Sequence, residues 1–441
     1  MRTKKEEMIK PKESFKGDVP ILKEPLPSSL TEGNIVVGKV LDGTNTQTVS
    51  LPTLPLLSDN DLMLLGESNE VQINYLTNYC LNAYHTNQSL IIFDTNEHTL
   101  LTDQLTNMIP KHKLHLIDMN SATLPPLSFT ELDTLFTYNP FKAIEIKTEL
   151  TLRVLMSIKG HDLTLRMQEL LRAACLVVYL HTNTTVQDVI KCITHYTCRL
   201  KYIQGIPEEY CTKPEVEQAV IILSRINSYN SEGKIIGTVS YKVDFLTSRI
   251  RFLKQDTRLI RMLNNIGSPI DLESNINQKK IIIFKLNESC PYTKQFLVTF
   301  LLSKVEAWRV LRLHTLVLQD YVHVVLPTSI LNSKQSNFVK EMITQSRSIT
   351  RLSFVLCSET LQEVSKFYSE QTFQGISRIF TQTAKLGDII NSLPMLYPYN
   401  LSDFLNLSET EALAFIRSAY DEITPFTCKL AQSHLLAQVL E

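Results

Sequence analysis

Residues 66–73 read Gly-Glu-Ser-Asn-Glu-Val-Gln-Ile, between an apolar run at 62–65 and a stretch of helical character at 71–84. This is the setting of a phosphate-binding loop, whose pattern is G-x-x-x-x-G-K-[ST]. The first glycine of the pattern is present as Gly66. The second glycine, the lysine and the hydroxyl residue are replaced by Val71, Gln72 and Ile73. The sequence therefore indicates a nucleotide-binding architecture that has lost its phosphate-binding side chains.

The composition is that of an ordinary globular protein with balanced charge. The 441 residues include 44 Lys+Arg and 45 Asp+Glu, so the chain offers no uniformly basic surface for nucleic acid. Only 12 residues are glycine, well below the usual share of about 7%. Loss of a glycine-rich nucleotide site and simple compositional drift explain this shortage equally well.

Cysteine spacing and hydropathy indicate a cytoplasmic protein. The eight cysteines form no C-x-x-C pair, which argues against a zinc site and for buried thiols in a reducing compartment. No run of 18 apolar residues and no signal peptide is present, so we expect no membrane span. His314 and His323 lack a third ligand at metal spacing, and we expect no metal site.

Strands and helices alternate along most of the chain, which predicts an α/β fold with a mostly parallel sheet. Asp42-Gly43 predicts a hairpin between the first two strands. Thr184 is the expected N-cap of one helix. The expected strands are 35–40, 47–51, 62–65, 89–94, 113–117, 280–286, 315–318, 352–357 and 376–380, and the expected helices include 71–84, 99–108, 215–229, 241–253, 291–311, 337–345 and 361–371.

The same pattern divides the chain into four parts. Residues 1–32 mix lysine, glutamate and proline and are expected to form a flexible charged tail. Residues 33–147 and 266–441 carry the strands and form the two halves of one core. Residues 148–265 carry amphipathic helices and form an inserted all-α domain.

The order of these elements resembles the conjugative DNA-transfer ATPases, that is, the type IV secretion coupling proteins and their HerA/FtsK-like relatives. Val37-Gly38 resembles the family's first strand, Asp94 and the three residues after it resemble its Asp-Pro-Lys-Gly motif, and Tyr138-Asn139-Pro140-Phe141 resembles its Asn-Pro motif. Lys279–Leu286 resembles the strand that follows the helical insertion. The resemblance covers residues 34–430 and implies a RecA/HerA-like P-loop NTPase core.

The chain departs from the family at its chemical positions. The Walker B strand should end in Asp-Glu, which hold magnesium and activate water. Here 315–318 lead into Gln319 and Asp320, and the sensor strand leads into Glu359 in place of a glutamine. Arg347 stands where the family carries a candidate arginine finger. These departures from the family predict a degenerate member that neither binds ATP–Mg tightly nor hydrolyses it, and no cofactor is expected.

Two further motifs each have a structural and a functional interpretation. The basic run of 249–261 could contact DNA phosphates, although a solvated helix face is the commoner role of such a run. Its members are Arg249, Arg251, Lys254, Arg258 and Arg261. Asp94 could be a relic of a metal or hydrogen-bond site, and Asp320 could be a displaced catalytic carboxylate. Polar residues that end buried strands more often cap turns.

Three functions follow from the resemblance. The first is a pseudo-ATPase subunit that assembles with itself or with an active ATPase paralogue in a ring, with DNA as a further partner. The second is an active DNA-pumping ATPase with a rearranged site that uses Gln72 and Asp320, for which ATP and magnesium would be cofactors. The third is a protein-interaction scaffold unrelated to DNA transfer, because a fold alone does not determine a function.

Overall fold

The computed structural model describes residues 25–42, 44–52, 61–67, 70–95, 100–119, 121, 124–157, 163–253, 255–264, 270–286, 291–315, 321–344, 351–368, 373, 375–382, 397–418 and 422–431. The chain forms two compact units. Unit 1 consists of Met1–Gln88, Asp103–Met108 and Ser353–Glu441, and unit 2 consists of Ser89–Thr102 and Ile109–Leu352. Helix α2 (Leu100–Met108) belongs partly to each unit.

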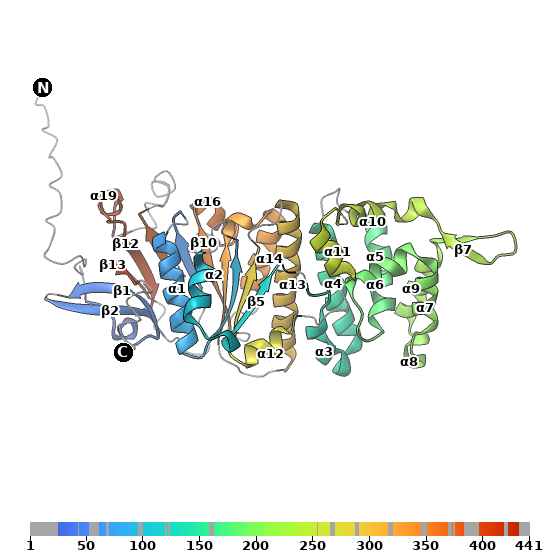
Figure 1. Cartoon of the computed structure of the whole chain (residues 1–441), viewed down its shortest axis with the longest axis horizontal. Helices are drawn as coiled ribbons and strands as arrows, with labels where there is room; N and C mark the ends of the chain where they lie inside the picture. The colour runs from blue at the N-terminus through green and yellow to red at the C-terminus, as the bar shows by residue number, and fades with distance from the viewer. Residues whose placement is uncertain are drawn as a thin grey trace, which may run out of the picture. The chain divides into compact units, whose positions relative to one another are not determined.

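Unit 1 contains seven strands in the order β2-β1-β13-β12-β11-β3-β10. The central strand β3 pairs in parallel with β10 and β11, and the remaining pairs are antiparallel. Strand β1 pairs with β13, so the first and last described strands of the chain are neighbours in this unit (Figure 1). The strands are β1 (Ile35–Asp42), β2 (Asn45–Leu51), β3 (Leu62–Leu65), β10 (Leu352–Ser358), β11 (Ser377–Thr381), β12 (Glu411–Arg417) and β13 (Ile423–Leu430).

The helices of unit 1 follow from local sequence signals. Helix α1 buries an almost continuous face, and α16 and α19 are short helices with side-chain N-caps, Thr360 and Asn400. Leu30 in the 3-10 turn η1 is fully buried, so the end of the expected tail packs within this unit. The elements are η1 (Ser28–Leu30), α1 (Glu70–His85), α16 (Leu361–Val364) and α19 (Leu401–Leu405).

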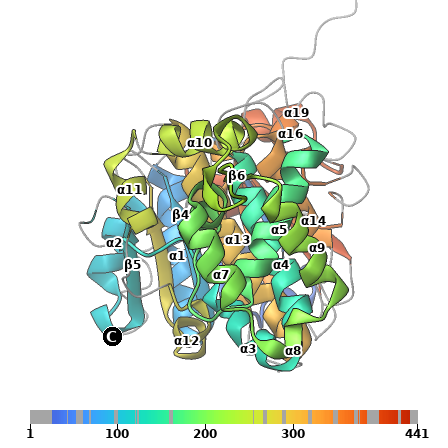
Figure 2. The same ribbon diagram turned by 90° about the vertical axis from the view of Figure 1, so that its right-hand side faces the viewer.

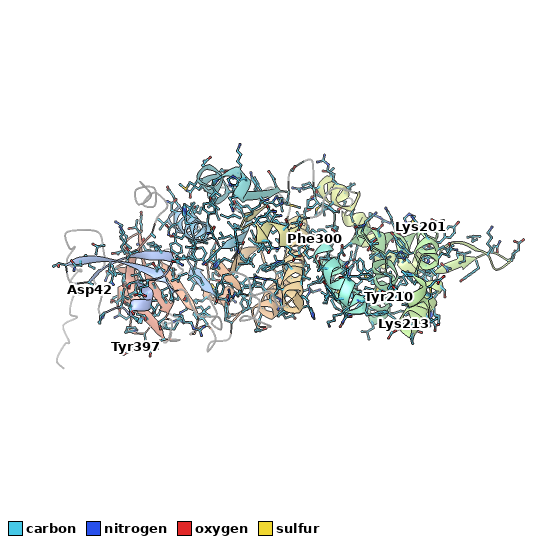
Figure 3. The ribbon with its side chains drawn as sticks, turned by 90° about the horizontal axis from the view of Figure 1, so that it is seen from below. Asp42, Lys201, Tyr210, Lys213, Phe300 and Tyr397 are labelled. Carbon is cyan, nitrogen blue, oxygen red and sulfur yellow. The ribbon has the colours of Figure 1, made fainter. Side chains whose placement is uncertain are left out.

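Unit 2 contains four parallel strands in the order β9-β4-β8-β5. Strand β4 is buried at all six positions and β8 at four of five, which explains their continuous runs of Ile, Leu and Phe. The strands are β4 (Ser89–Asp94), β5 (Leu114–Asp118), β8 (Ile281–Lys285) and β9 (Val322–Pro327). Helix α13 (Pro291–Thr315) buries Phe300, labelled in Figure 3, and Trp308.

Most described helices of unit 2 come from one continuous stretch of the chain, which Figure 2 shows face on. A small hairpin, β6 (Asn227–Tyr229) with β7 (Ile235–Thr238), interrupts them. Tyr210 of α8, labelled in Figure 3, packs edge-on against Phe141 of α4 with ring centroids 5.8 Å apart. The helices are α3 (Asp133–Tyr138), α4 (Pro140–Ser157), α5 (Leu165–Tyr179), α6 (Val186–Thr194), α7 (Tyr196–Gln204), α8 (Glu208–Cys211), α9 (Pro214–Ser224), α10 (Ser240–Leu253) and α11 (Thr257–Asn264).

The remaining elements of unit 2 are short, apart from α14. Helix α12 precedes β8 and has Asp271 as its N-cap, whose carboxylate accepts the N–H of Ser274 at 2.8 Å. The elements are η2 (Lys111–Lys113), η3 (Thr130–Leu132), η4 (Thr328–Ile330), α12 (Leu272–Asn277) and α14 (Ser333–Thr344).

The structure corrects several expected elements. The N-cap of α6 is Thr185, not Thr184, because Asp188 completes a capping box with Thr185. Helix α13 extends to Thr315, so the expected strand 315–318 does not begin there, and 316–318 lie outside the described residues. The helix expected at 361–371 ends at Val364. Strands β9, β12 and β13 were not expected from the sequence. In the described part of the chain, no helix is long and apolar enough to cross a bilayer.

His323 lies within β9 and makes stability depend on pH. Burial lowers its pKa from 6.5 to about 4. As the pH falls below about 6.5, the unfolded chain takes up a proton that the folded protein does not accept until about pH 4. We expect the free energy of unfolding to fall by about 2 kcal/mol between pH 7.5 and pH 5 from this residue alone.

The measurement is chemical denaturation of the wild type and of His323→Gln at both pH values. The variant should lose this part of the pH dependence, whereas His112→Gln, which changes an exposed histidine, should retain it. An unchanged pH dependence in His323→Gln would show that the imidazole is not buried in its neutral form.

Candidate functional site

The loop between β3 and α1 occupies the position of a phosphate-binding loop. Gly66 follows the last residue of β3, and α1 begins four residues later at Glu70. The backbone φ angle of Gly66 is 146°, a conformation that residues with a Cβ atom rarely adopt. The retained glycine of the motif therefore has a backbone role that does not depend on phosphate.

Both neighbouring strands hold the start of this loop. The N–H of Gly66 donates to the carbonyl of Ser358 at 2.9 Å, and the hydroxyl of Thr381 donates to the carbonyl of Leu65 at 3.1 Å. The parallel register places Ser358 and Phe380 opposite Leu65. The loop thus lies at the carboxyl edge of three parallel strands, where ligands bind in open α/β sheets.

Gln72 stands at the lysine position of the motif and turns back onto the loop. Its side chain is 2% exposed, and its Nε2 donates to the carbonyl of Gly66 at 3.1 Å. A phosphate-binding lysine would instead extend its ammonium toward the ligand. Ile73, at the hydroxyl position, is 5% exposed and offers no metal ligand. Val71, at the second glycine position, is partly exposed.

The charged residues around the loop are acidic. Glu67 and Glu70 are both exposed, and Glu70 stands in the first turn of α1. A carboxylate there interacts favourably with the positive end of the helix dipole, which is the same feature that would attract a phosphate. Negative charge at Glu67 and Glu70 therefore disfavours the approach of a nucleotide phosphate to this helix end.

The end of β10 is occupied by local hydrogen bonds. The hydroxyl oxygen of Ser358 lies 2.9 Å from the Glu363 carboxylate and 2.9 Å from the carbonyl oxygen of Thr360, so its one proton is shared between these two acceptors. Glu359, the expected sensor position, follows the strand directly and is partly buried.

Unit 2 contains the strand that follows α13, which the sequence analysis predicted at the wrong residues. The described strand after the long helix α13 is β9, which ends at Pro327 and is followed by Thr328. Neither residue has the carboxylate that a Walker B position needs for magnesium. Gln319, Asp320 and Arg347, named from the sequence, lie outside the described residues.

Asp94 has a capping role. Its carboxylate accepts the N–H of Thr102 at 3.2 Å as well as the Thr102 hydroxyl. Thr102 lies in the first turn of α2, whose N-terminal donors need such partners. This agrees with the interpretation of Asp94 as a residue that ends a strand and caps a turn.

The structure separates the members of the basic run. Arg249 is only 6% exposed, and the Arg258 side chain pairs with Asp256 at 2.8 Å. Arg251 and Arg261 are exposed, and Lys254 lies outside the described residues. The run is therefore not one continuous basic face. Among the described residues, no cluster of three or more metal-ligating side chains is found.

Comparison with known proteins places the fold. No protein-family profile and no curated protein matches the sequence. Two solved structures of the plasmid coupling protein TrwB, one with a GTP analogue and one with ADP and Mg2+, each match with 12% identity and a TM-score of 0.51 over 87% of this chain and 88% of theirs. VirB4 of Thermoanaerobacter pseudethanolicus matches with 13% identity and a TM-score of 0.50 over 91% of this chain and 96% of its own. The chain therefore has the α/β P-loop ATPase fold of the conjugative coupling proteins and of VirB4.

Proposed function

We propose that this chain is a degenerate member of the conjugative DNA-transfer ATPases that neither binds ATP–Mg2+ tightly nor hydrolyses it. It acts in the assembly or regulation of a DNA-translocation complex, as a subunit of an oligomer with itself or with an active ATPase. One observation carries the proposal. At the position of the phosphate-binding lysine, the Gln72 amide is buried and donates to the carbonyl of Gly66.

The energies favour this interpretation. A hydrogen bond to a charged group contributes about 1.5–3 kcal/mol. Loss of the lysine, of the hydroxyl and of the Walker B carboxylate removes several such contacts at once. A nucleotide would also have to break the bond between Gln72 and Gly66 and approach the exposed carboxylates of Glu67 and Glu70. TrwB is a protein of the same fold that was solved with ADP and Mg2+, so the architecture itself is compatible with nucleotide.

The direct test is calorimetric titration of the purified chain with ATP and Mg2+. We expect no binding tighter than about 1 mM, because a loss of 4 kcal/mol or more weakens a micromolar site about a thousandfold. A matched variant, Val71→Gly with Gln72→Lys and Ile73→Thr, restores the motif and should bind more tightly than the wild type. Magnesium-dependent binding of the wild type in the low micromolar range would overturn the proposal.

Hydrolysis and assembly need separate measurements. Phosphate release from pure protein should remain at background with and without DNA, and DNA-stimulated release would instead indicate an active pump with a rearranged site. Light scattering should show an oligomer, alone or after mixing with an intact transfer ATPase encoded near this chain. A chain that stays monomeric and captures no such ATPase would be better explained as an unrelated scaffold.

A further inference from the structure

A cavity of about 570 Å³ opens between four helices of unit 2. Helix α4 packs against both α5 and α13, and α13 packs against α14 (Figure 2). The volume falls within the range of about 300–1,000 Å³ that small-molecule sites occupy. All lining residues belong to one compact unit, so the cavity is a feature of that unit alone.

One side of the cavity is apolar. Leu152 and Met156 of α4 line it together with Phe338 of α14. Leu152 and Phe338 are only 3% and 2% exposed, whereas Met156 is partly exposed, so Met156 provides most of the accessible apolar surface of this wall. This wall could contact the hydrocarbon or aromatic body of a ligand and remove it from water.

Two arginines that line the same cavity are fixed in position by ion pairs. The guanidinium of Arg153 stacks on the ring of Phe338 at 3.7 Å and donates to Glu341 through both terminal nitrogens at 3.2 Å. Arg172 of α5 forms a two-nitrogen pair with Glu149 of α4. The two arginine side chains remain 36% and 47% exposed, so each is oriented yet accessible to a ligand.

The first turn of α14 adds to the positive side. Asn332 and Gln335 form a reciprocal cap, with backbone-to-side-chain distances of 2.9 and 3.0 Å. Both residues line the cavity with Lys334, so the positive end of the helix dipole lies in its wall. Lys334 therefore lines the cavity together with Arg153 and Arg172, which are paired with Glu341 and Glu149.

We propose that this cavity is a binding site for a small organic anion that has an apolar body and one acidic group, a carboxylate, sulfonate or phosphate. The body lies against the wall formed by Leu152, Met156 and Phe338. The acidic group lies toward Arg153, Arg172 and Lys334. The ligand contacts α4, α5 and α14, and its binding stabilises unit 2 because it favours the folded state.

The test uses two fluorescent probes that differ only in charge. 8-Anilinonaphthalene-1-sulfonate has an aromatic body and one sulfonate, and N-phenyl-1-naphthylamine is the same body without the sulfonate. We expect the full chain to bind the sulfonate probe with a Kd below about 100 μM and the neutral probe about tenfold more weakly, the effect of one charge-assisted contact at a partly exposed site. Equal binding of both probes, or no binding of either, overturns the proposal.

Three variants locate the site. Arg172→Gln should lower the affinity for the sulfonate probe about tenfold and leave the affinity for the neutral probe unchanged. Met156→Trp fills the cavity and should lower the affinity for both probes. Lys201→Gln removes an exposed charge on α7, labelled in Figure 3, that does not line the cavity, and both probes should bind to it as to the wild type. If Arg172→Gln and Met156→Trp, folded by circular dichroism, bind the sulfonate probe like the wild type, the proposal fails.

Discussion

Replacement of Lys304 by methionine should destabilise the protein by about 3–5 kcal/mol, the cost of a buried charge left without its partner. The Lys304 and Glu131 side chains are 0% and 1% exposed, and their charged atoms are 2.6 Å apart. The Lys304 ammonium also donates to the carbonyl of Ser128 at 3.1 Å. Burial raises the pKa of Glu131, and the nearby Lys304 charge opposes this rise.

The measurement is chemical denaturation at neutral pH, with a double variant and an exposed pair as controls. Lys304→Met with Glu131→Leu should recover most of the lost stability, because no charge then remains buried. Lys142→Met removes a pair with Glu145 whose side chains are 43% and 62% exposed, and it should change stability by less than about 1 kcal/mol. Equal losses in the single and double variants would show that the two charges are not coupled.

The loss in Lys304→Met should also depend on pH. Without the lysine, Glu131 has a pKa above its unfolded value, so the carboxylate destabilises the folded state wherever the unfolded chain is ionised. The destabilisation should therefore be present at neutral pH and decrease as the pH falls toward about 4.5, the ordinary value for this residue. A loss that is constant across this range would indicate lost packing instead of lost charge compensation.

Arg199→Met should be the second strongly destabilising change, by about 4–6 kcal/mol. Arg199 is fully buried in the helical part of unit 2, and its guanidinium donates five hydrogen bonds of 2.6 to 3.1 Å. The acceptors are the Asn227 side chain, the Thr238 hydroxyl and the carbonyls of Cys192 and Ile193. Each buried acceptor left unpaired costs about 1–3 kcal/mol.

The geometry explains why lysine cannot substitute for Arg199. The carbonyls of Cys192 and Ile193 belong to the last turn of α6, where carbonyl groups have no N–H partner within the helix. Asn227 and Thr238 belong to the β6–β7 hairpin. Only a planar fork of donors reaches all of them, so Arg199→Lys should also be destabilising. Arg225→Met, at an exposed position, is the matched control, measured by denaturation in parallel. A stable Arg199→Met would show that water replaces the guanidinium.

The fold was largely predictable because its signals are local. The apolar runs predicted as strands at 89–94 and 280–286 contain the buried strands β4 and β8. Gly66 follows a strand and Gln72 lies in the first turns of a helix, as the sequence predicts. The position of β9 was not predictable, because 315–318 and 322–327 have similar apolar patterns. Only the length of α13, set by tertiary packing, distinguishes them.

The sequence alone shows which residues of the phosphate-binding motif are missing. It does not show which contacts their replacements make. The replacement of lysine by Gln72 is visible in the sequence, but its bond to Gly66 depends on the path of the loop. The basic run gave a similar difficulty. Its spacing favours a solvated face, yet Arg249 is buried because of how α10 packs. Burial of a charged side chain requires partners from distant parts of the chain, which periodicity does not reveal.

The hydrogen bonds that Ser358, Thr381 and Gln72 make to the loop have a consequence for the energetics of a ring. A motor subunit changes its stability and contacts as triphosphate is bound, cleaved and released, because a ligand favours the state that binds it. Where the described start of the loop is held by bonds within the chain, it gains nothing from that cycle. Such a subunit would present the same face to its neighbours at any ratio of ATP to ADP, as a fixed reference beside moving partners.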